Sequence, residues 1–324
     1  MPKHACFFTA VKIMAYKKAQ SAMEYLMTYG WAILIIAVVL GALFELGVFD
    51  PATLAPKAEP GSCQVYRPYG PGTTTDMNLI GACLNMLPKF VADMNGDGII
   101  STTYVQTSVH AYTITAWIKT TSGSGNPIVQ DRGSNSGNSI TMEIGYNGGQ
   151  AAHPGTVNCG LDSADVWIGG FTYVPAIGQP LAFNNGEWHF VACTFDSADG
   201  SQITPAAFTV YVDGKQEPLY TQQLGSVTSP VTGLGGTGIG YQQPWNDYFD
   251  GEIANIQIYN KSLGQESITT LYDEGVGGDP IELQYLMGWW PLNGNSNDYS
   301  GNGNNGQASG VVYTGAWTSG YSGP

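Results

Sequence analysis

Short stretches with the patterning of β-strands constrain the fold of this chain more than any other feature of its 324 residues. Four of them are residues 112–118 (YTITAWI), 139–144 (SITMEI), 188–195 (WHFVACTF) and 208–212 (FTVYV), and Gly, Asn, Asp or Pro separates them. A period of two with β-branched and aromatic residues is typical of strands that lie on a core. Many short strands without alternating helices predict an all-β sandwich.

Composition excludes several other classes of protein. Glycine makes up 44 of 324 residues, about 14%, without a G-x-y repeat, so the chain is not collagen-like. The net charge of −14 leaves no basic face for a phosphate backbone, which excludes nucleic acid as a partner. Charged residues are only 11%, against about 25% in an average soluble domain. Such a composition, rich in turn residues, is typical of an exported surface protein.

Two local signals refine the prediction for the sandwich. Asp213-Gly214 directly follows the stretch 208–212, and this dipeptide is a strong signal for a two-residue hairpin turn. Residues 265–273 (QESITTLYD) are the only stretch that resembles a soluble helix, with Ser262 as its candidate cap.

The N-terminal region has the pattern of a membrane helix. Residues 1–19 contain four of the eleven basic residues and no acid, and residues 31–44 (WAILIIAVVLGALF) are apolar throughout. Fourteen residues are short for a membrane span, but residues 25–29 extend the run to spanning length. We therefore expect a membrane helix whose lysine-rich end lies in the cytoplasm, with the remainder of the chain outside.

The residues before the apolar run contain a candidate processing site. Lys17-Lys18-Ala19 is followed by Gln20-Ser-Ala-Met-Glu24, and together these residues resemble a class III signal peptide of archaeal type IV pilin-like proteins. The resemblance implies that a prepilin peptidase cuts between Ala19 and Gln20, and Glu24 matches the acidic fifth residue of the mature chain. The new amino group of Gln20 would neutralise Glu24, whose carboxylate is costly beside lipid, in the same or a neighbouring subunit. The alternative is an uncleaved signal anchor with Glu24 among lipid headgroups.

These features divide the chain into four parts. We expect a leader peptide (1–19), a transmembrane or pilin-type helix (20–49), a proline-rich linker (50–62) and an ectodomain (63–324).

The ectodomain resembles the LamG-like, or concanavalin A-like, jelly roll. The resemblance rests on the ordered motifs YTITAWIKT, GEWHFVACTFD, FTVYVDGK, YFDGEIANIQIYNKSL and SITTLYDEG, within about residues 110–275. Residues 286–310 (LMGWWPLNGNSNDYSGNGNNGQASG) resemble the opening strands of that family, yet they come last. We therefore expect a circularly permuted sandwich, with Trp289 or Trp290 buried between the sheets. Strand donation to a neighbouring subunit is the alternative.

The cysteines indicate an oxidising compartment. Cys6 lies in the predicted leader, which leaves Cys63, Cys83, Cys159 and Cys193 in the region expected outside the cell. Four cysteines allow three pairings, and proximity in sequence favours Cys63–Cys83 and Cys159–Cys193. No C-x-x-C motif indicates a zinc site.

One candidate calcium loop lies near the start of the ectodomain. Asp93, Asn95 and Asp97 provide oxygen ligands at positions one, three and five, and Gly98 is at position six. Position twelve is Tyr104, where a calcium loop has glutamate. A plain turn between two strands is the alternative.

A second candidate for a structural calcium ion comes from the resemblance, because members of that family often hold one. Asp298 and Asn302, in the segment NDYSGNGNNG, are its candidate ligands. A turn rich in glycine and asparagine is the alternative.

The sequence favours no catalytic function. Residues 247–252 (DYFDGE) lack the Glu-x-Asp-x-x-Glu spacing of the related glucanases, in which acid and nucleophile share one strand face. His110, His153 and His189 are scattered and suggest no metal trio, and no G-x-S-x-G motif is present. We therefore predict that the chain is not an enzyme.

Carbohydrate binding is implied by the resemblance, with exposed aromatic side chains stacking on sugar rings. Trp167, Trp245 and Tyr248 are the candidate ligand-binding residues, although an aromatic residue of a sandwich can equally belong to the core. Asn260-Lys261-Ser262 is a candidate glycosylation sequon.

These observations lead to one functional hypothesis. We expect a pilin-like or membrane-anchored protein of an archaeal cell surface, which displays its sandwich for adhesion or for binding carbohydrate or glycoprotein. Its expected partners are the membrane, a prepilin peptidase, like subunits in a filament, and surface glycans. It would lie in the cell membrane with its C-terminal domain outside, or in a surface filament. The alternatives are a membrane-anchored lectin that does not polymerise and, with less support, a glycan hydrolase.

Overall fold

The computed structural model contains two units, Met1–Lys57 and Ala58–Pro324. It describes residues 27, 29–41, 63–83, 87–105, 108–123, 125–132, 138–146, 153–163, 166–232, 234–242 and 246–324. The predicted leader, the processing residues Ala19, Gln20 and Glu24, and the linker 50–62 lie outside these described residues.

In the first unit, residues 29–41 are helical and their side chains are exposed. Among the helices that the structure describes, none combines the length and the apolar character needed to cross a membrane.

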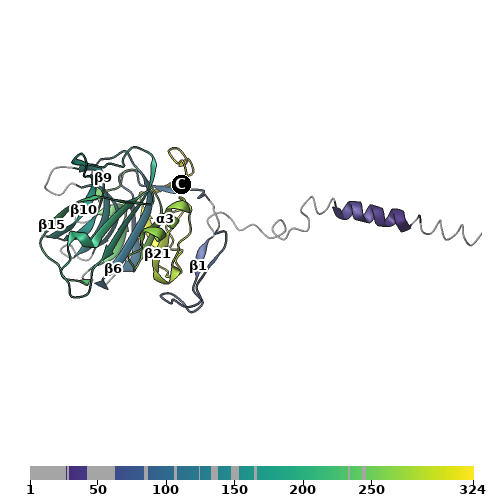
Figure 1. The fold of residues 1–324 in the computed structure, drawn as a ribbon, viewed down its shortest axis with the longest axis horizontal. Helices are drawn as coiled ribbons and strands as arrows, with labels where there is room; N and C mark the ends of the chain where they lie inside the picture. The colour runs from purple at the N-terminus through teal and green to yellow at the C-terminus, as the bar shows by residue number, and fades with distance from the viewer. Residues whose placement is uncertain are drawn as a thin grey trace, which may run out of the picture. The chain divides into compact units, whose positions relative to one another are not determined.

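The second unit is built from two large antiparallel sheets (Figure 1). The nine-stranded sheet has the order β11-β10-β9-β8-β7-β17-β4-β22, and β15 also pairs with β10. Its strands are β4 (Ile99–Val105), β7 (Asn126–Arg132), β8 (Ser139–Tyr146), β9 (His153–Ser163), β10 (Val166–Val174), β11 (Gln179–Pro180), β15 (Leu219–Leu224), β17 (Gly236–Ile239) and β22 (Gly306–Ser309).

The eight-stranded sheet has the order β14-β13-β12-β6-β20-β3-β23, and β21 also pairs with β20. Its strands are β3 (Val91–Asp93), β6 (Ala111–Lys119), β12 (Trp188–Asp196), β13 (Phe208–Val212), β14 (Lys215–Glu217), β20 (Glu252–Tyr259), β21 (Leu286–Trp290) and β23 (Val312–Thr314). Short two-stranded pairs are β1 (Gln64–Tyr66) with β2 (Asn78–Ile80), β5 (Ser108–Val109) with β16 (Val231–Thr232), and β18 (Tyr241–Gln242) with β19 (Asp247–Tyr248).

The main core lies between the two large sheets, and strand alternation explains its composition. On β6, Ile114 and Ile118 belong to this core, whereas Trp117 belongs to a second cluster on the other face of the eight-stranded sheet. All four predicted strands fall within β6, β8, β12 and β13. The all-β sandwich predicted from their pattern is therefore confirmed.

The outer face of the eight-stranded sheet is covered by the helix α3 (Gln265–Asp273), which has the predicted bounds. Its Ile268 and Leu271 pack into the second cluster with Trp117 of β6. The predicted cap, Ser262, is wrong, because Gly264 occupies the N-cap position and α3 begins at the next residue.

Asp213 and Gly214 form the predicted turn between β13 and β14, both with positive φ, as the mirror-image hairpin turn requires.

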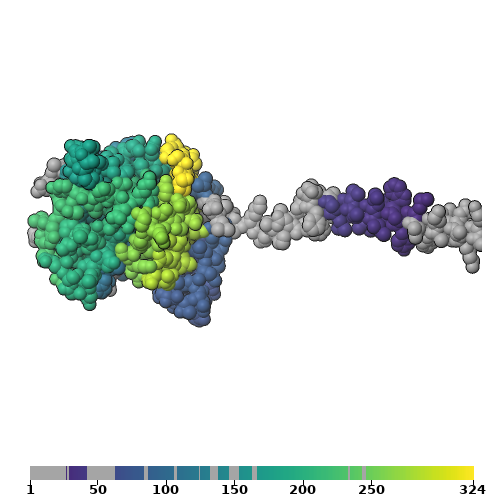
Figure 2. Space-filling model, viewed as in Figure 1, coloured from purple at the N-terminus to yellow at the C-terminus, as the bar shows by residue number. Residues whose placement is uncertain are grey.

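The C-terminal segment supplies strands to both large sheets. Strand β21 pairs with β20 and β23 with β3 in one sheet, and β22 pairs with β4 in the other. Trp290 is fully buried in the core between the sheets, and Trp289 is buried in the second cluster, so the predicted burial is confirmed. Figure 2 shows these late residues, in yellow-green, as part of the surface of the second unit. Within this chain the segment completes the sandwich, as a permuted arrangement requires.

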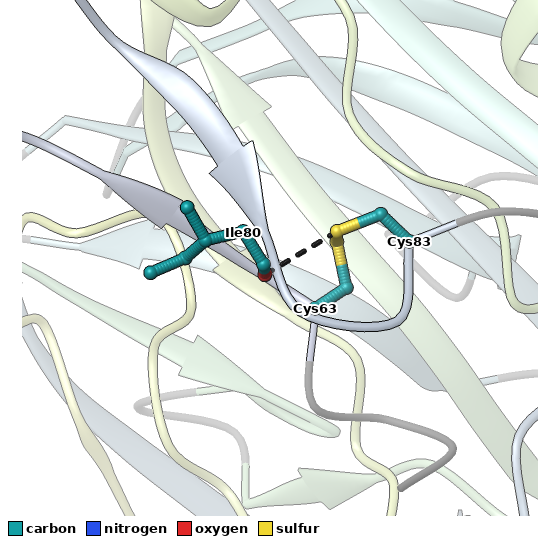
Figure 3. Close-up of a disulfide and its surroundings, with 3 residues drawn as sticks. All are labelled: Cys63, Ile80 and Cys83. Atoms are coloured by element: carbon teal, nitrogen blue, oxygen red, sulfur yellow. Dashed lines mark hydrogen bonds between the residues drawn. A yellow bond between two sulfur atoms is a disulfide. The ribbon is translucent and has the colours of Figure 1, made fainter. Parts of the chain in front are cut away.

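Two disulfides join the predicted cysteine pairs. Cys159 on β9 and Cys193 on β12 are fully buried, and their bond links the two large sheets through the core. Cys63–Cys83 instead closes the arm formed by β1 and β2, and Figure 3 shows it beside the carbonyl oxygen of Ile80, which lies 3.4 Å from the Cys83 sulfur.

Arg67, at the end of β1, ties this arm to the C-terminal segment. Its buried guanidinium donates hydrogen bonds to the carbonyl oxygens of Ser300 at 2.8 Å and Leu286 at 2.9 Å, and to that of Thr73 within the arm. Carbonyl oxygens far apart in sequence are therefore held by one cation, which fixes the arm on β21.

Candidate functional site

The outward face of the nine-stranded sheet carries an ordered grid of side chains from four adjacent strands, three of which are labelled in Figure 1. Residues such as Ile140, Met142 and Val157 of these strands point into the core, so the alternate positions face outward. Strand register aligns them in rows across β8, β9, β10 and β15. The rows are Ser139–Asp162–Trp167–Leu224, Thr141–Gly160–Gly169–Gln222 and Glu143–Asn158–Phe171–Tyr220.

In the middle row, Gly160 and Gly169 face each other across β9 and β10 and leave room for a neighbouring ring. A Cβ atom on Gly169 would lie 2.3 Å from the Cys159 carbonyl oxygen, and one on Gly160 would lie 3.0 Å from Cη2 of Trp167. The indole of Trp167 therefore lies over Gly160, and it is only 7% exposed. Only glycine allows this close approach.

A strip of aromatic rings lies beside the two glycines. Phe171 and Tyr220 are stacked, with ring centroids 5.2 Å apart and an angle of 27° between the rings. His153 stacks on Phe171 at 4.0 Å, and Tyr173 lies 5.6 Å from Tyr220. Tyr220 is 46% exposed while Phe171 is buried, so the strip becomes accessible towards the β15 edge. Accessible stacked rings of this kind can bind the apolar face of a sugar.

Acidic and amide groups line the β8 and β9 end of the same face. Burial, with repulsion from Asp162 and Asp247, raises the pKa of Glu143 to about 8. Asp247 belongs to the hairpin of β18 and β19, which packs against β7. Asn158, paired with Glu143 across the strands, is fully buried, and its Oδ1 atom accepts no hydrogen bond from the described residues. This end of the face therefore holds a buried carboxyl group and a buried amide side by side.

The three predicted ligand-binding residues have different environments. Trp167 belongs to the grid, and Tyr248 faces Tyr241 within the β18–β19 hairpin, where the ring centroids lie 5.0 Å apart. Trp245 lies outside the described residues.

Sequence reasoning missed the most exposed aromatic residue of the grid, Tyr220, and the buried acid Glu143. Strand β15 (LYTQQL) lacks the apolar alternation that would have indicated a strand. Glu143 lies within a predicted strand. The alternation of that strand places Glu143 on the face opposite to Met142 and Ile144, which point into the core.

The candidate calcium ligands are engaged in turns. At the β3–β4 turn, Asp93 Oδ1 accepts the backbone N–H of Asn95 at 3.1 Å. Asn95 itself has φ of 49°, a turn conformation. Asp97 lies in the same turn, where its backbone N–H donates to the Met94 carbonyl at 3.1 Å. This local bonding favours the alternative of a plain turn.

The second pair of candidate calcium ligands, Asp298 and Asn302, is also engaged in a turn. The Asp298 carboxylate accepts backbone N–H groups from Trp289, Ser300 and Asn304 at 3.0, 2.8 and 2.7 Å. Asn302 Oδ1 accepts the backbone N–H of Gly72 at 2.9 Å. Both side chains therefore hold the glycine-rich turn and the arm, which favours the turn alternative here as well.

Among the described residues, one group of metal-ligating side chains is close enough to hold an ion: Cys63, Cys83 and Asp279. Its two sulfur atoms form a disulfide, so neither is available as a thiolate ligand.

The histidines and the acidic stretch 247–252 have separate partners. His189 lies between Asp213 at 2.8 Å and Asn185 at 3.0 Å, and His110 lies 4.0 Å from Asp199. His153 stacks on Phe171 of the grid, so the three histidines do not converge. Glu252, at the start of β20, pairs with Lys119 of β6 at 3.3 Å. Asn260 of the sequon is exposed at the end of β20.

Two packed antiparallel sheets form a jelly-roll sandwich, and the stacked rings of Phe171 and Tyr220 lie on the outward side of one sheet. The chain belongs to the concanavalin A-like lectin/glucanases superfamily, whose family model, Laminin_G_3, matches residues 93–269. No curated protein matches it.

Several solved structures resemble the chain. A candidate carbohydrate binding protein from Bacteroides ovatus is 17% identical, with 74% of this chain and 67% of that chain covered and a TM-score of 0.48. The SAP-like pentraxin of Limulus polyphemus is 16% identical, with 79% and 95% covered and a TM-score of 0.42. Domains LG4-5 of the mouse laminin α1 chain are 14% identical, with 57% and 46% covered and a TM-score of 0.35. Identities this low concern the fold and not the ligand.

Proposed function

We propose that this chain is a cell-surface protein whose sandwich binds carbohydrate or glycoprotein on the outward face of the nine-stranded sheet. The single observation that carries the proposal is the stacked pair of Phe171 and Tyr220, which leaves the ring of Tyr220 46% exposed at the β15 edge of the sheet. Membership of a superfamily of lectins and glucanases supports it.

The chemistry of the face suits a sugar. A pyranose ring has an apolar face that packs on an aromatic ring, and hydroxyl groups around its edge that donate hydrogen bonds. Tyr220 would support the apolar face, while Gln222, two residues further along β15 on the same side of the sheet, would receive the hydroxyls. Contacts of both kinds on one surface are what fixes a ligand's orientation.

An extracellular location agrees with the disulfides. Bonds such as Cys63–Cys83 and Cys159–Cys193 persist outside the reducing cytoplasm. Exposure of Asn260 in its sequon is compatible with glycosylation there.

The N-terminal part of the proposal is a pilin-type export signal. A prepilin peptidase would cut between Ala19 and Gln20, and Glu24 would then face the new amino group in the same or a neighbouring subunit. A mass spectrum of the mature protein tests this, because the pilin hypothesis requires Gln20 as the first residue. A mature chain that begins at Met1 would leave the membrane-anchored lectin as the better account.

A glycan array tests the binding face. We expect the secreted part of the chain to bind a subset of glycans, and Tyr220→Ala to weaken that binding about tenfold, because a stacked ring contributes ~1.5 kcal/mol. Tyr69→Ala is the matched control, since Tyr69 is 66% exposed but lies on the arm. Equal loss in both variants, or none in either, would contradict the proposed face.

A further inference from the structure

The two disulfides differ in their access to solvent. Both cysteines of Cys159–Cys193 are fully buried between the sheets. In Cys63–Cys83, by contrast, Cys83 is half-buried and Cys63 lines a small pocket of about 30 Å³. Figure 3 shows this bond at the end of the arm, beside Ile80. An external reagent can therefore reach one disulfide and not the other.

A carboxyl group lies next to the accessible bond. An oxygen of Asp279 and the sulfur atoms of Cys63 and Cys83 all lie within 4.8 Å of one another, and Asp279 lines the same pocket as Cys63. Burial and repulsion from Glu274 raise the pKa of Asp279 to about 7, so this carboxyl carries a proton for part of the time at neutral pH. Among the described residues, Glu274 is the charged side chain whose repulsion contributes to this shift.

We propose that Cys63–Cys83 is a site of thiol–disulfide exchange with small external thiols, in which Asp279 is the proton donor to the departing sulfur. The thiolate attacks Cys83, the more exposed sulfur, and forms a mixed disulfide with it. The bond between the cysteines breaks, its electron pair moves to Cys63, and Cys63 takes the proton of the Asp279 carboxyl. A second external thiol then releases Cys83 as a thiol, and the two external thiols leave oxidised as one disulfide.

The expected consequence is local. Opening the bond frees the C-terminal end of β2 from Cys63, while Arg67 still binds Ser300 and Leu286. The sandwich, with its buried Cys159–Cys193, stays closed.

The test treats the folded protein with glutathione, followed by alkylation and mass mapping. We expect a mixed disulfide on Cys83 and no opening of Cys159–Cys193. The rate of mixed-disulfide formation, divided by the concentration of glutathione thiolate, should fall as the pH rises through about 7, because Asp279 loses its proton. In Asp279→Asn this normalised rate should be at least about tenfold lower and should not change with pH.

Asp273→Asn, at the exposed end of α3, is the matched control and should exchange at the wild-type rate. Equal opening of both disulfides would overturn the proposal, and so would a flat normalised profile in the wild-type protein. If Asp279→Asn kept the normalised exchange rate and the pH dependence of the wild-type protein, the proposal would be overturned as well. The pH dependence of the wild-type protein tests the role of Asp279 even if that variant does not fold.

Discussion

At the scale of single residues, Glu143 makes the grid sensitive to pH. Its folded pKa, raised to about 8 by burial and by Asp162 and Asp247, lies above the ordinary value of 4.5. The ionised form therefore costs stability in the folded state. That cost is complete above pH 8 and is relieved as the pH falls through 8, by at most about 1.4 kcal/mol for each pH unit.

Replacement of Glu143 by Gln removes this cost and keeps the shape of the side chain. We expect the stability advantage of the variant over the wild-type protein to grow between pH 6 and pH 9, as measured by chemical unfolding at each pH. Glu266→Gln, exposed in the first turn of α3, is the control and should show a constant difference. A constant difference in Glu143→Gln as well would mean that Glu143 is solvated.

At the scale of elements, the C-terminal strands are integral to the sandwich. Strands β21, β22 and β23 pair with β20, β4 and β3, and Trp290 is fully buried between the sheets. A chain that ends at residue 280 would expose unpaired edges and an apolar face. Loss of one large buried aromatic alone costs about 3–5 kcal/mol, comparable with the ~5–15 kcal/mol stability of a whole domain.

We therefore expect an ectodomain shortened to residues 63–280 to be insoluble or molten, whereas residues 63–324 fold as a monomer. Thermal unfolding and size-exclusion chromatography of the two chains measure this. Cooperative unfolding of both at one temperature would make the tail an appendage. Interlocked oligomers of residues 63–324 would instead favour strand donation between subunits.

Local sequence patterns predicted the elements more successfully than the site. The turn at Asp213-Gly214, the helix 265–273 and the strand 208–212 are determined by neighbouring residues, and all three are present. Tyr220 and Glu143 come to lie in one cross-strand row only through the register of β8, β9, β10 and β15, which no local pattern contains. The cap at Ser262 was wrong because the chain remains extended as far as Gly264.

At the scale of the whole molecule, the two faces of the sandwich have different roles. The eight-stranded sheet is covered by α3 and by the C-terminal residues around Trp317, which bury its outer face in the second cluster. The nine-stranded sheet keeps Tyr220 and Leu224 exposed at its β15 edge. The exposed aromatic ring of Tyr220 is why we propose the β15 edge of the nine-stranded sheet as the binding surface.

A crystal structure of residues 63–324 with an oligosaccharide from the array tests this central claim most directly. We predict a sugar ring packed on Tyr220, with its hydroxyl groups directed towards Gln222 of the same strand. A glycan bound instead at the β3–β4 turn, or on the arm beside Tyr69, with Tyr220 left free, would contradict the account.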